Sequence, residues 1–485
     1  MMKTKCIFYW MALARTSSFL PAANGWIPPS RSPAPKPCRP NNVEINEPGP
    51  SKVLEEIGDA STSNVSSRRD ILAGTAATTI SLIGSASYAK YADALGLESF
   101  NEKQQYSLKF PTLFAPLYGE SYRKTIKRSM GRSTIASSNI TTATSNDSIW
   151  ALEQNLELGP LQTPLRCTVV RLDDGTLWVH APLAPTEEFF ELVESCGSGN
   201  RDAVAHVVVP TYALEHKVFV KDALRRWPNA QLWTSPEQFS FPFAISEKII
   251  FGKAVSGVLG SSFSNSFDSQ RIPPWSNEIE YASLEAGTFN IGGKPTTLCE
   301  TAFFHRASKS LIVTDAVAKI PKSVPPLNDP EQLLLISKRS TSDAMPSDTP
   351  QARLDGWEKT ALLVSYFFPE HEEPDPEKAG VVTWTEGWHD NFNALAGRLI
   401  VPPVVRTLIY AQNPARVQNW VDQVTNGRWD FDQIIPAHFE APIAATPNDF
   451  AAAFRFLKDD SIDSFPKNDL ARGLKPIADI ALKRL

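Results

Sequence analysis

The sequence predicts an α/β fold in which a β-sandwich carries helices on its outer faces, preceded by a disordered N-terminal region with targeting signals. Three observations support this fold class. Strand and helix patterns alternate between residues 167 and 233, only strand patterns occur between residues 279 and 315, and helix patterns return from residue 357. With 485 residues, of which 42% are apolar, the chain is long enough to bury a large core.

The first 40 residues have the pattern of a signal for import into a plastid. Lys3 and Lys5 precede an apolar run at residues 6–14, which is too short to span a bilayer and indicates a secretory signal. Residues 17–21 resemble the cleavage motif of algae with secondary, red-lineage plastids. Residues 22–40 are rich in Pro, Ser and Arg and contain no acidic residue, as is typical of a transit peptide.

A second export signal follows. Residues 67–72, with Arg68 and Arg69 at their centre, resemble a twin-arginine motif, and a mildly apolar run at residues 73–84 leads to the small residues Ser87 and Ala89. The alternative is a small amphipathic helix after a disordered tail. Two signals in this order over residues 1–89 predict a chloroplast protein of the thylakoid lumen, and we expect no transmembrane segment in the mature chain.

Residues 90–146 are expected to form a polar linker with a basic patch. We interpret the patch as a solvated helix face, with contact to an anionic membrane surface as the alternative. The formal net charge of the whole chain is −5, which gives no reason to expect a nucleic-acid partner. The patch consists of Arg123, Lys124, Lys127, Arg128 and Arg132.

The core domain is expected to span residues 147–457 and to begin with alternating strands and helices. Residues 167–172 and 176–180 flank the turn sequence Asp173, Asp174, Gly175 and predict a hairpin. Thr186 is expected to cap a helix, and residues 205–210 predict a strand buried on both faces. A helix at residues 218–226 and a strand at residues 230–233 complete this half.

The second half combines strands with a helical C-terminal part. Strands are expected at residues 279–284, 300–304, 311–315 and 432–435, and helices at residues 357–366, 388–395, 416–424, 448–457 and 471–482. Residues 458–485 are expected to be a C-terminal helical extension. Cys167, Cys196 and Cys299 match neither a disulfide framework nor a metal site, so we expect buried thiols.

Three of the seven histidines are candidates for metal binding. A catalytic zinc site needs about three protein ligands and one open position. His180, His216 and His438 each follow a predicted strand, and strand ends are where α/β folds collect functional groups. The other four histidines are assigned to solvent, core, a turn and a helix start.

Four blocks of sequence, residues 177–185, 209–217, 302–315 and 435–442, resemble the domain-of-unknown-function 4336 family of cyanobacteria, algae and plants. That family is related to the metallo-β-lactamase superfamily, and the resemblance covers residues 147–457. It implies a metallo-β-lactamase-like four-layer αββα sandwich. It implies no reaction, because the family has no established activity.

The resemblance also implies a half-dismantled metal site. Superfamily enzymes carry a His-x-His-x-Asp-His motif after a strand, and the matching positions here are Thr211, Ala213, Glu215 and His216. The two histidines that would hold the first metal are therefore absent. The third ligand of the first metal, expected within residues 296–300, is also replaced.

The second metal subsite is retained in this comparison. Glu215 replaces the motif's Asp, His216 is intact, Asp315 matches the superfamily's bridging Asp, and His438 matches its C-terminal His. We expect one divalent metal, with zinc first and iron or manganese next. His180 is a further ligand or an outer hydrogen-bond donor, and Glu215 or Asp315 is the catalytic base if it does not ligate.

These residues support two hypotheses of different classes. The first is a mononuclear metal-dependent hydrolase of a small-molecule ester, lactone, thioester or phosphoester. The second is a non-catalytic scaffold or assembly factor that uses the fold to bind a lumenal protein partner, with the acid–His pairs serving as structural groups. A flavodiiron-like redox protein would need two metals, which the missing first subsite argues against.

Overall fold

The computed structural model describes residues 98–99, 124–131, 148–158, 161–197, 199–238, 247–260, 272–291, 294–378, 381–459 and 465–482. The two export signals predicted in residues 1–89 lie outside this part of the chain. Within it, no helix combines the length and the apolar composition needed to cross a membrane.

The first sheet has eight strands in the described chain, and their spatial order follows the sequence. Neighbours from β1 to β5 are antiparallel, and neighbours from β5 to β8 are parallel. The strands are β1 (Glu98–Ser99), β2 (Ile126–Ser129), β3 (Ile149–Leu158), β4 (Leu161–Arg171), β5 (Leu177–His180), β6 (Val204–Val209), β7 (Gln231–Thr234) and β8 (Gly257–Val258).

The local signals in this half are confirmed. Asp174 accepts a hydrogen bond from the backbone N–H of Thr176, and Gly175 has a φ of 83°, so the predicted turn joins β4 to β5. Thr186 caps α5 (Glu187–Glu194) by accepting from the backbone N–H of Phe189. Helix α6 (Val220–Arg226) connects β6 to β7, and α7 (Glu247–Phe251) precedes β8.

The second sheet has five strands in the described chain, in the order β15, β14, β11, β10, β9. β11 and β14 are parallel, and the other neighbours are antiparallel. The strands are β9 (Ile279–Ile291), β10 (Lys294–His305), β11 (Ser310–Ile312), β14 (Gln433–Ile435) and β15 (Ile443–Ala444). The pairing of β11 with β14 brings together segments about 120 residues apart, one leading to Asp315 and the other to His438.

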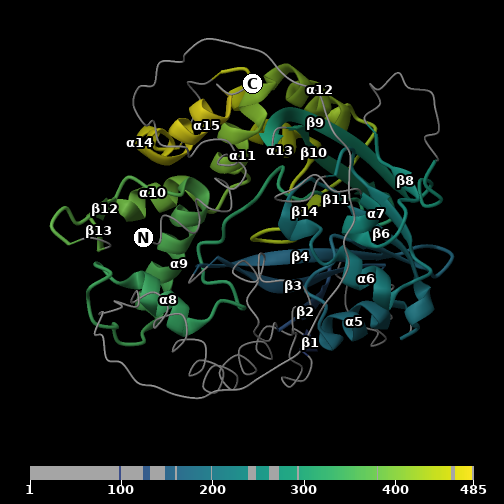
Figure 1. Ribbon diagram of the computed structural model, residues 1–485, viewed down its shortest axis with the longest axis horizontal. Helices are drawn as coiled ribbons and strands as arrows, with labels where there is room; N and C mark the ends of the chain where they lie inside the picture. The colour runs from purple at the N-terminus through teal and green to yellow at the C-terminus, as the bar shows by residue number, and fades with distance from the viewer. Residues whose placement is uncertain are drawn as a thin grey trace, which may run out of the picture. The chain divides into compact units, whose positions relative to one another are not determined.

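Three apolar clusters define the layers, and β10 illustrates why. Phe303 points into the cluster between the sheets, together with Trp178, whereas Ala302 and Phe304 pack under the C-terminal helices, as the two-residue period of a strand requires. A third cluster joins the outer face of the first sheet to α5 and α6. Figure 1 shows α6 beside β6 and α12 beside β9. The predicted four-layer αββα arrangement is confirmed.

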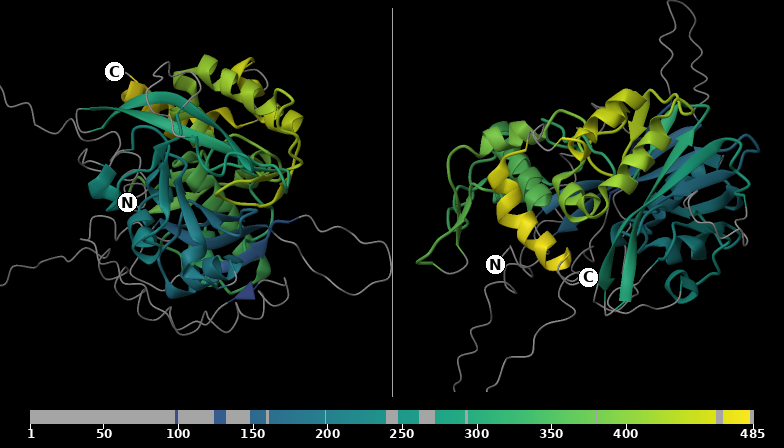
Figure 2. Two further views of the ribbon diagram at one scale, coloured as in Figure 1. Left: turned by 90° about the vertical axis from the view of Figure 1, so that its right-hand side faces the viewer. Right: turned by 90° about the horizontal axis from the view of Figure 1, so that it is seen from above.

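The C-terminal part contains predicted and unpredicted helices. Those over residues 357–366, 388–395 and 416–424 are confirmed as α9, α10 and α12, whereas α8, α11 and the small hairpin β12–β13 were not predicted. Pro330 and Pro403 stand at the first residues of α8 and α11, where proline starts a helix and does not break it. The elements are α8 (Pro330–Ser337), α9 (Pro350–Tyr366), β12 (Glu372–Pro374), β13 (Val382–Trp384), α10 (Trp388–Leu395), α11 (Pro403–Leu408), α12 (Pro414–Thr425), α13 (Pro447–Ala453), α14 (Lys467–Asp469) and α15 (Lys475–Leu482). Figure 2 shows these helices from two further directions.

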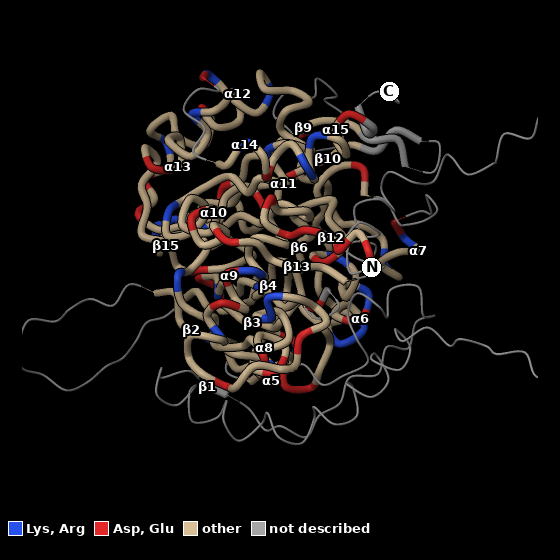
Figure 3. Tube along the Cα trace, turned by 90° about the vertical axis from the view of Figure 1, so that its left-hand side faces the viewer, with Lys and Arg blue, Asp and Glu red and all other residues tan. Residues whose placement is uncertain are grey.

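The basic stretch of the expected linker differs from the prediction. Of its described residues, Lys127 and Arg128 lie in strand β2, not in a helix, and β2 pairs along β3. Lys127 donates to the Ser195 hydroxyl at 2.7 Å, and Arg128 contacts Glu153. A strand forms here because the edge of β3 would otherwise expose unpaired backbone groups. In Figure 3, basic and acidic positions are interspersed along the trace.

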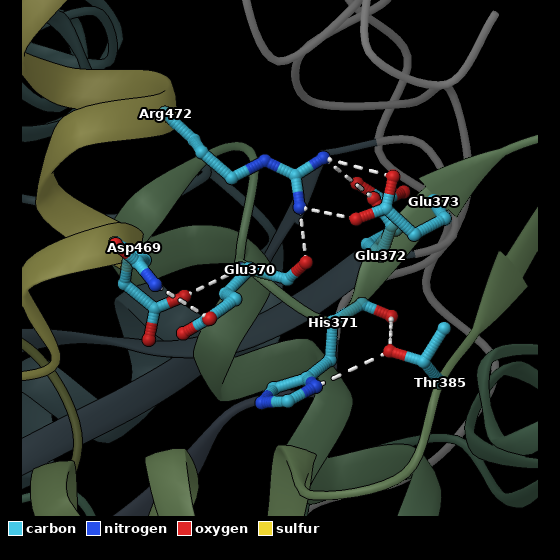
Figure 4. Close-up of polar contacts among 8 residues, drawn as sticks. Glu370, His371, Glu372, Glu373, Thr385, Asp469 and Arg472 are labelled. Carbon is cyan, nitrogen blue, oxygen red and sulfur yellow. Dashed lines mark hydrogen bonds and ion pairs between the residues drawn. The ribbon is translucent and has the colours of Figure 1, made fainter.

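The expected C-terminal extension packs into the same core as the preceding helices. Leu474 is fully buried there. Arg472 donates to the backbone carbonyl of Glu370 and, at 2.7 Å, to the Glu373 carboxylate, while Asp469 accepts from the Glu370 N–H at 2.6 Å (Figure 4). This segment is therefore an integral part of the helical layer.

Candidate metal centre

Strand ends from both sheets deliver the candidate residues. After β6 the chain turns through Thr211 into a short helical turn, Leu214–His216, which presents Glu215 and His216. Asp315 follows β11, and His438 follows β14, which runs parallel to β11. The two sheets are joined beside this point, since Thr211 forms a backbone bridge with Glu300 of β10.

Two imidazoles converge on one carboxylate oxygen. The Nε2 atom of His216 lies 3.5 Å from Asp315 Oδ1, and the Nε2 atom of His438 lies 3.3 Å from the same oxygen. One ligand atom from each of Glu215, His216 and His438 lies within 4.8 Å of the others. The structure therefore brings together all four residues predicted for the second subsite.

The orientation of the His438 ring is set by the backbone of β4. Its Nδ1 atom lies 3.0 Å from the carbonyl oxygen of Pro164, and His438 forms a backbone bridge with Leu165. In the neutral ring this contact assigns the hydrogen to Nδ1 and leaves the Nε2 lone pair facing the site. Imidazoles that bind metals are oriented by such a bond from their second nitrogen.

The pKa values of the two acids at the site, Asp315 and Glu215, are shifted in opposite directions. Burial opposes ionisation of Asp315, but the imidazoles of His216 and His438 outweigh it and hold the pKa of Asp315 well below its ordinary value. Burial alone would lower the pKa of His438, yet its contact with Asp315 raises it. Burial raises the pKa of Glu215, and the negative charge of Asp315 adds to the effect of burial. Asp315 is thus the permanent anion, and Glu215 is the acid that gains and loses a proton more readily.

His216 provides the test of whether these residues fit a metal. Its side chain is buried, its Nδ1 atom has no hydrogen-bond partner among the described residues, and its Nε2 atom has only the 3.5 Å contact with Asp315. Buried polar atoms are nearly always satisfied, so a ring this poorly paired beside two carboxylates and a second imidazole fits the role of a metal ligand. Two nitrogen and two carboxylate donors suit zinc, iron or manganese. The residues fit one divalent metal ion.

His180, also predicted as a ligand, is not part of the group of three. It lies at the end of β5, stacked on Trp178 with ring centroids 5.6 Å apart and edge-on to Phe303. Burial, with a further contribution from His216, lowers the pKa of His180 to about 3. Its ring nitrogens have no hydrogen-bond partner in the described chain. His180 is thus a neutral ring in the layer between the sheets.

The side chains at the positions that the resemblance assigns to a first metal bond to other groups of the protein. The Thr211 hydroxyl donates to the carbonyl of Cys299 at 2.9 Å. The carboxylate of Glu300 accepts from the backbone N–H of Thr314 at 2.8 Å and from the Thr314 hydroxyl. Burial, together with the charge of Asp315, raises the pKa of Glu300 to about 8. A buried carboxyl and a threonine thus stand where the resemblance expects histidines.

Sequence reasoning missed two of the residues around the site. Glu300 was only placed within a range, although an acid at the start of an otherwise apolar predicted strand was a usable signal. Tyr410, from the short helical turn Tyr410–Gln412, had no signal. Burial, with the negative charges of Glu300 and Asp315, raises the pKa of Tyr410 well above its ordinary value, so its phenol stays protonated.

The prediction of buried thiols is confirmed. Cys167, Cys196 and Cys299 are buried and form no disulfide in the described residues. Burial raises the pKa of the Cys299 thiol well above its ordinary value, so it is not a reactive thiolate.

Comparison with known proteins places the chain in a family. Residues 146–456 match the family described as "Domain of unknown function (DUF4336)". No match was found among curated proteins. Solved structures similar to this chain include a metal-soaked flavodiiron core from Synechocystis sp. PCC6803, with 8% identity and a TM-score of 0.32, covering 65% of this chain and 60% of that chain.

Two further structures are examples of those similar to this chain. A putative diflavin flavoprotein fragment from Nostoc sp. PCC 7120 has 9% identity and a TM-score of 0.31, covering 65% of this chain and 94% of that chain. A metallo-β-lactamase from Pontibacter korlensis has 10% identity and a TM-score of 0.29, covering 66% of this chain and 99% of that chain. Because the family match spans well over half of the sequence, the chain belongs to the domain-of-unknown-function 4336 family.

Proposed function

We propose that the protein binds one divalent metal ion at His216, His438 and Asp315 and hydrolyses a small ester, lactone, thioester or phosphoester. The observation that carries the proposal is the convergence of two imidazole Nε2 atoms, at 3.5 and 3.3 Å, on Oδ1 of a partly buried carboxylate that stays ionised. A second acid, Glu215, lies within reach of both imidazoles. Three protein ligands and an open position are what a catalytic metal requires.

The pKa directions divide the roles of the two acids. Asp315 holds its negative charge at any ordinary pH, which suits a ligand. Burial raises the pKa of Glu215 toward the working range of a proton acceptor. We therefore assign the ligand role to Asp315 and the general-base role to Glu215.

The chemistry of the site would be hydrolytic. A divalent metal bound there supplies a Lewis acid for a carbonyl or phosphoryl oxygen and acidifies water. Glu215 takes up the proton of the attacking water, and the Nδ1 contact of His438 with Pro164 keeps that imidazole in one orientation. The tyrosine phenol of Tyr410 stays protonated and is able to donate a hydrogen bond.

Elemental analysis of the purified full chain tests the metal. The protein is prepared without an affinity tag of histidines and without chelator, beside a His216→Ala/His438→Ala variant and a His371→Ala control. His371 bonds to Thr385, away from the site. We expect about one equivalent of zinc, iron or manganese in the wild type and the control, and none in the double variant. A folded wild type without metal would overturn the proposal.

Activity is tested separately with Glu215→Gln. This variant should keep its metal and lose about 100-fold or more in turnover on model esters, lactones, thioesters and phosphoesters, since general-base catalysis contributes about 10²–10⁴-fold. If Glu215→Gln loses its metal instead, the assignments of Glu215 and Asp315 are reversed.

The second candidate function is a non-catalytic scaffold. It is favoured by the first subsite, where Thr211 and Glu300 are fully engaged within the protein. A scaffold would bind its partner equally well with His216 and His438 replaced. Cross-linking and pull-down with the double variant would therefore recover the same partner as the wild type.

The location in the thylakoid lumen is also a proposal, supported by the two successive export signals in residues 1–89. Import of the full chain into isolated plastids, with Arg68 and Arg69 replaced by Lys in a second sample, tests it. Accumulation of the variant outside the lumen is the expected result.

A further inference from the structure

Residues 436–442 form the loop that carries His438, and Arg166 binds backbone carbonyls of this loop. Arg166 lies on β4, and its guanidinium is buried. It donates through Nη1 to the carbonyl of Pro436 and through Nη2, at 2.6 Å, to the carbonyl of Phe439. The two acceptors lie on either side of His438 in the chain, so one rigid guanidinium fork spans the residue that ligates.

The guanidinium is itself held in place by a buried acid. Arg166 Nε donates to Glu153 Oε1 on β3 at 2.8 Å. Arg128 on β2 contacts the same oxygen and also donates to the carbonyl of Ala441 at 3.1 Å. Burial opposes the ionisation of Glu153, but the two guanidiniums outweigh it and lower its pKa. The acid therefore stays charged and fixes both arginines on the His438 loop.

These hydrogen bonds stabilise a loop whose backbone is strained. Phe439 has a φ of 60°, a left-handed conformation that is unfavourable for a non-glycine residue. The next residue is tied down as well, since the N–H of Glu440 donates to the carbonyl of Lys319 at 3.1 Å and its carboxylate pairs with Lys319 Nζ at 2.7 Å. A strained turn beside a site persists only when its surroundings hold it.

We infer that Arg166 is a positioning residue for His438. Its two bonds to the loop carbonyls keep the Nδ1 atom of His438 on the Pro164 carbonyl and present Nε2 to the site. Arg128, which lies before the family-matched residues 146–456, completes the grip from β2. The effect on metal affinity rests on the proposed function, whereas the effect on the His438 ring does not.

The test compares Arg166→Met and Arg166→Lys with the wild type, using the full chain and Zn²⁺ competed against a chromogenic chelator. Arg166→Met should weaken Zn²⁺ binding about 10–100-fold, the range found when groups that orient ligands are removed. Arg166→Lys keeps the charge but not the fork, and should recover only part of the loss. Equal Zn²⁺ affinity in Arg166→Met and the wild type would overturn the inference.

A second readout separates this inference from the proposed function. With ¹⁵N-labelled histidine in metal-free protein, at a pH high enough for the His438 ring to be neutral, the wild type should show its hydrogen on Nδ1, and Arg166→Met a mixture of both tautomers. If the wild type binds no metal, the proposed function is wrong. The positioning role of Arg166 is then tested by the His438 tautomer alone. An unchanged His438 signal in Arg166→Met then overturns the positioning role.

Two further variants serve as a substitute for Arg166→Met and as a control. If Arg166→Met does not fold, Arg128→Gln takes its place, and about threefold weaker Zn²⁺ binding is expected from a partly exposed pair. An unchanged affinity in Arg128→Gln would overturn the inference in that case. The matched control is Arg353→Met, which breaks an arginine–carboxylate pair of 2.6 Å with Asp348 on the surface and should leave both readouts unchanged.

Discussion

The two subsites that the resemblance predicts differ in how their side chains are bonded in this chain. The first subsite, at Thr211, Ala213 and Glu300, contains side chains that bond within the protein, with Thr211 on the Cys299 carbonyl and Glu300 on Thr314. The second subsite, at Glu215, His216, Asp315 and His438, keeps the buried Nδ1 atom of His216 without a hydrogen-bond partner among the described residues. Internal hydrogen bonds therefore satisfy the side chains at the first subsite, whereas those at the second are only partly paired.

The largest effect is expected from Asp315→Asn. The amide keeps the shape of the side chain but removes the charge that faces both imidazoles, so metal affinity should fall by more than about 100-fold, beyond the loss seen for groups outside the ligand shell. Calorimetric titration with Zn²⁺ measures it. Asp348→Asn, which removes a surface carboxylate paired with Arg353, is the control and should bind as the wild type does. Equal affinity in both variants would place the metal elsewhere.

The next effect comes from pH. Metal binding needs neutral imidazole, and the pKa of His438 is raised above its ordinary value of 6.5, so affinity should be full at high pH and fall as pH drops through that pKa. Between pH 8 and pH 5 the loss should be at least about 30-fold for this one proton. Asp315 stays ionised throughout and does not contribute. An affinity that is flat over this range would exclude His438 as a ligand.

The same shift has the opposite sign for the metal-free protein. Because the folded pKa of His438 is raised, its stabilising contribution is present below about pH 6.5 and is lost as pH rises through the folded value. Metal and protons therefore stabilise the second subsite in different pH ranges.

A smaller effect on the free energy of unfolding is expected from the titration of Glu300 at the first subsite. The pKa of Glu300 rises from 4.5 to about 8, so folding favours its protonated form. Its contribution is fully present below about pH 4.5 and is lost as pH rises toward 8. Metal-free Glu300→Gln cannot ionise and should gain stability relative to the wild type between pH 5 and pH 8 in urea unfolding. Its metal affinity should stay within about twofold, since Glu300 is not a ligand. A large loss of metal in this variant would show that the first subsite still takes part.

The smallest effect is expected from Thr211→Val. It removes the hydroxyl that donates to Cys299 and should cost about 1 kcal/mol of unfolding free energy, the usual value of one hydrogen bond. Metal binding should not change. Thermal unfolding with and without Zn²⁺ measures both, and a variant that loses Zn²⁺ would contradict the separation of the two subsites.

Elements with a strong local pattern were predictable. The turn at Asp174 and Gly175, the cap at Thr186 and the strand at residues 204–209 follow from side-chain chemistry within a few residues. The expected linker was less predictable, because β2 exists only through its pairing with β3 and has little apolar period of its own. The proline-led helices α8 and α11 were missed for a related reason: a proline has opposite meanings at the start and in the middle of a helix.

The sequence by itself determined the αββα order of layers and, through the resemblance, the four residues of the second subsite, because each follows a recognisable strand. Only the tertiary structure decided how those residues meet. Three sets of contacts join residues that are about 15 to 270 positions apart. They are the contacts of the imidazoles with Asp315, the hydrogen bonds of Thr314 to the Glu300 carboxyl, and the hydrogen bonds of Arg166 to the His438 loop. Such contacts leave no period or motif in the chain, since burial and distance between separate strands arise only when the sheets pack.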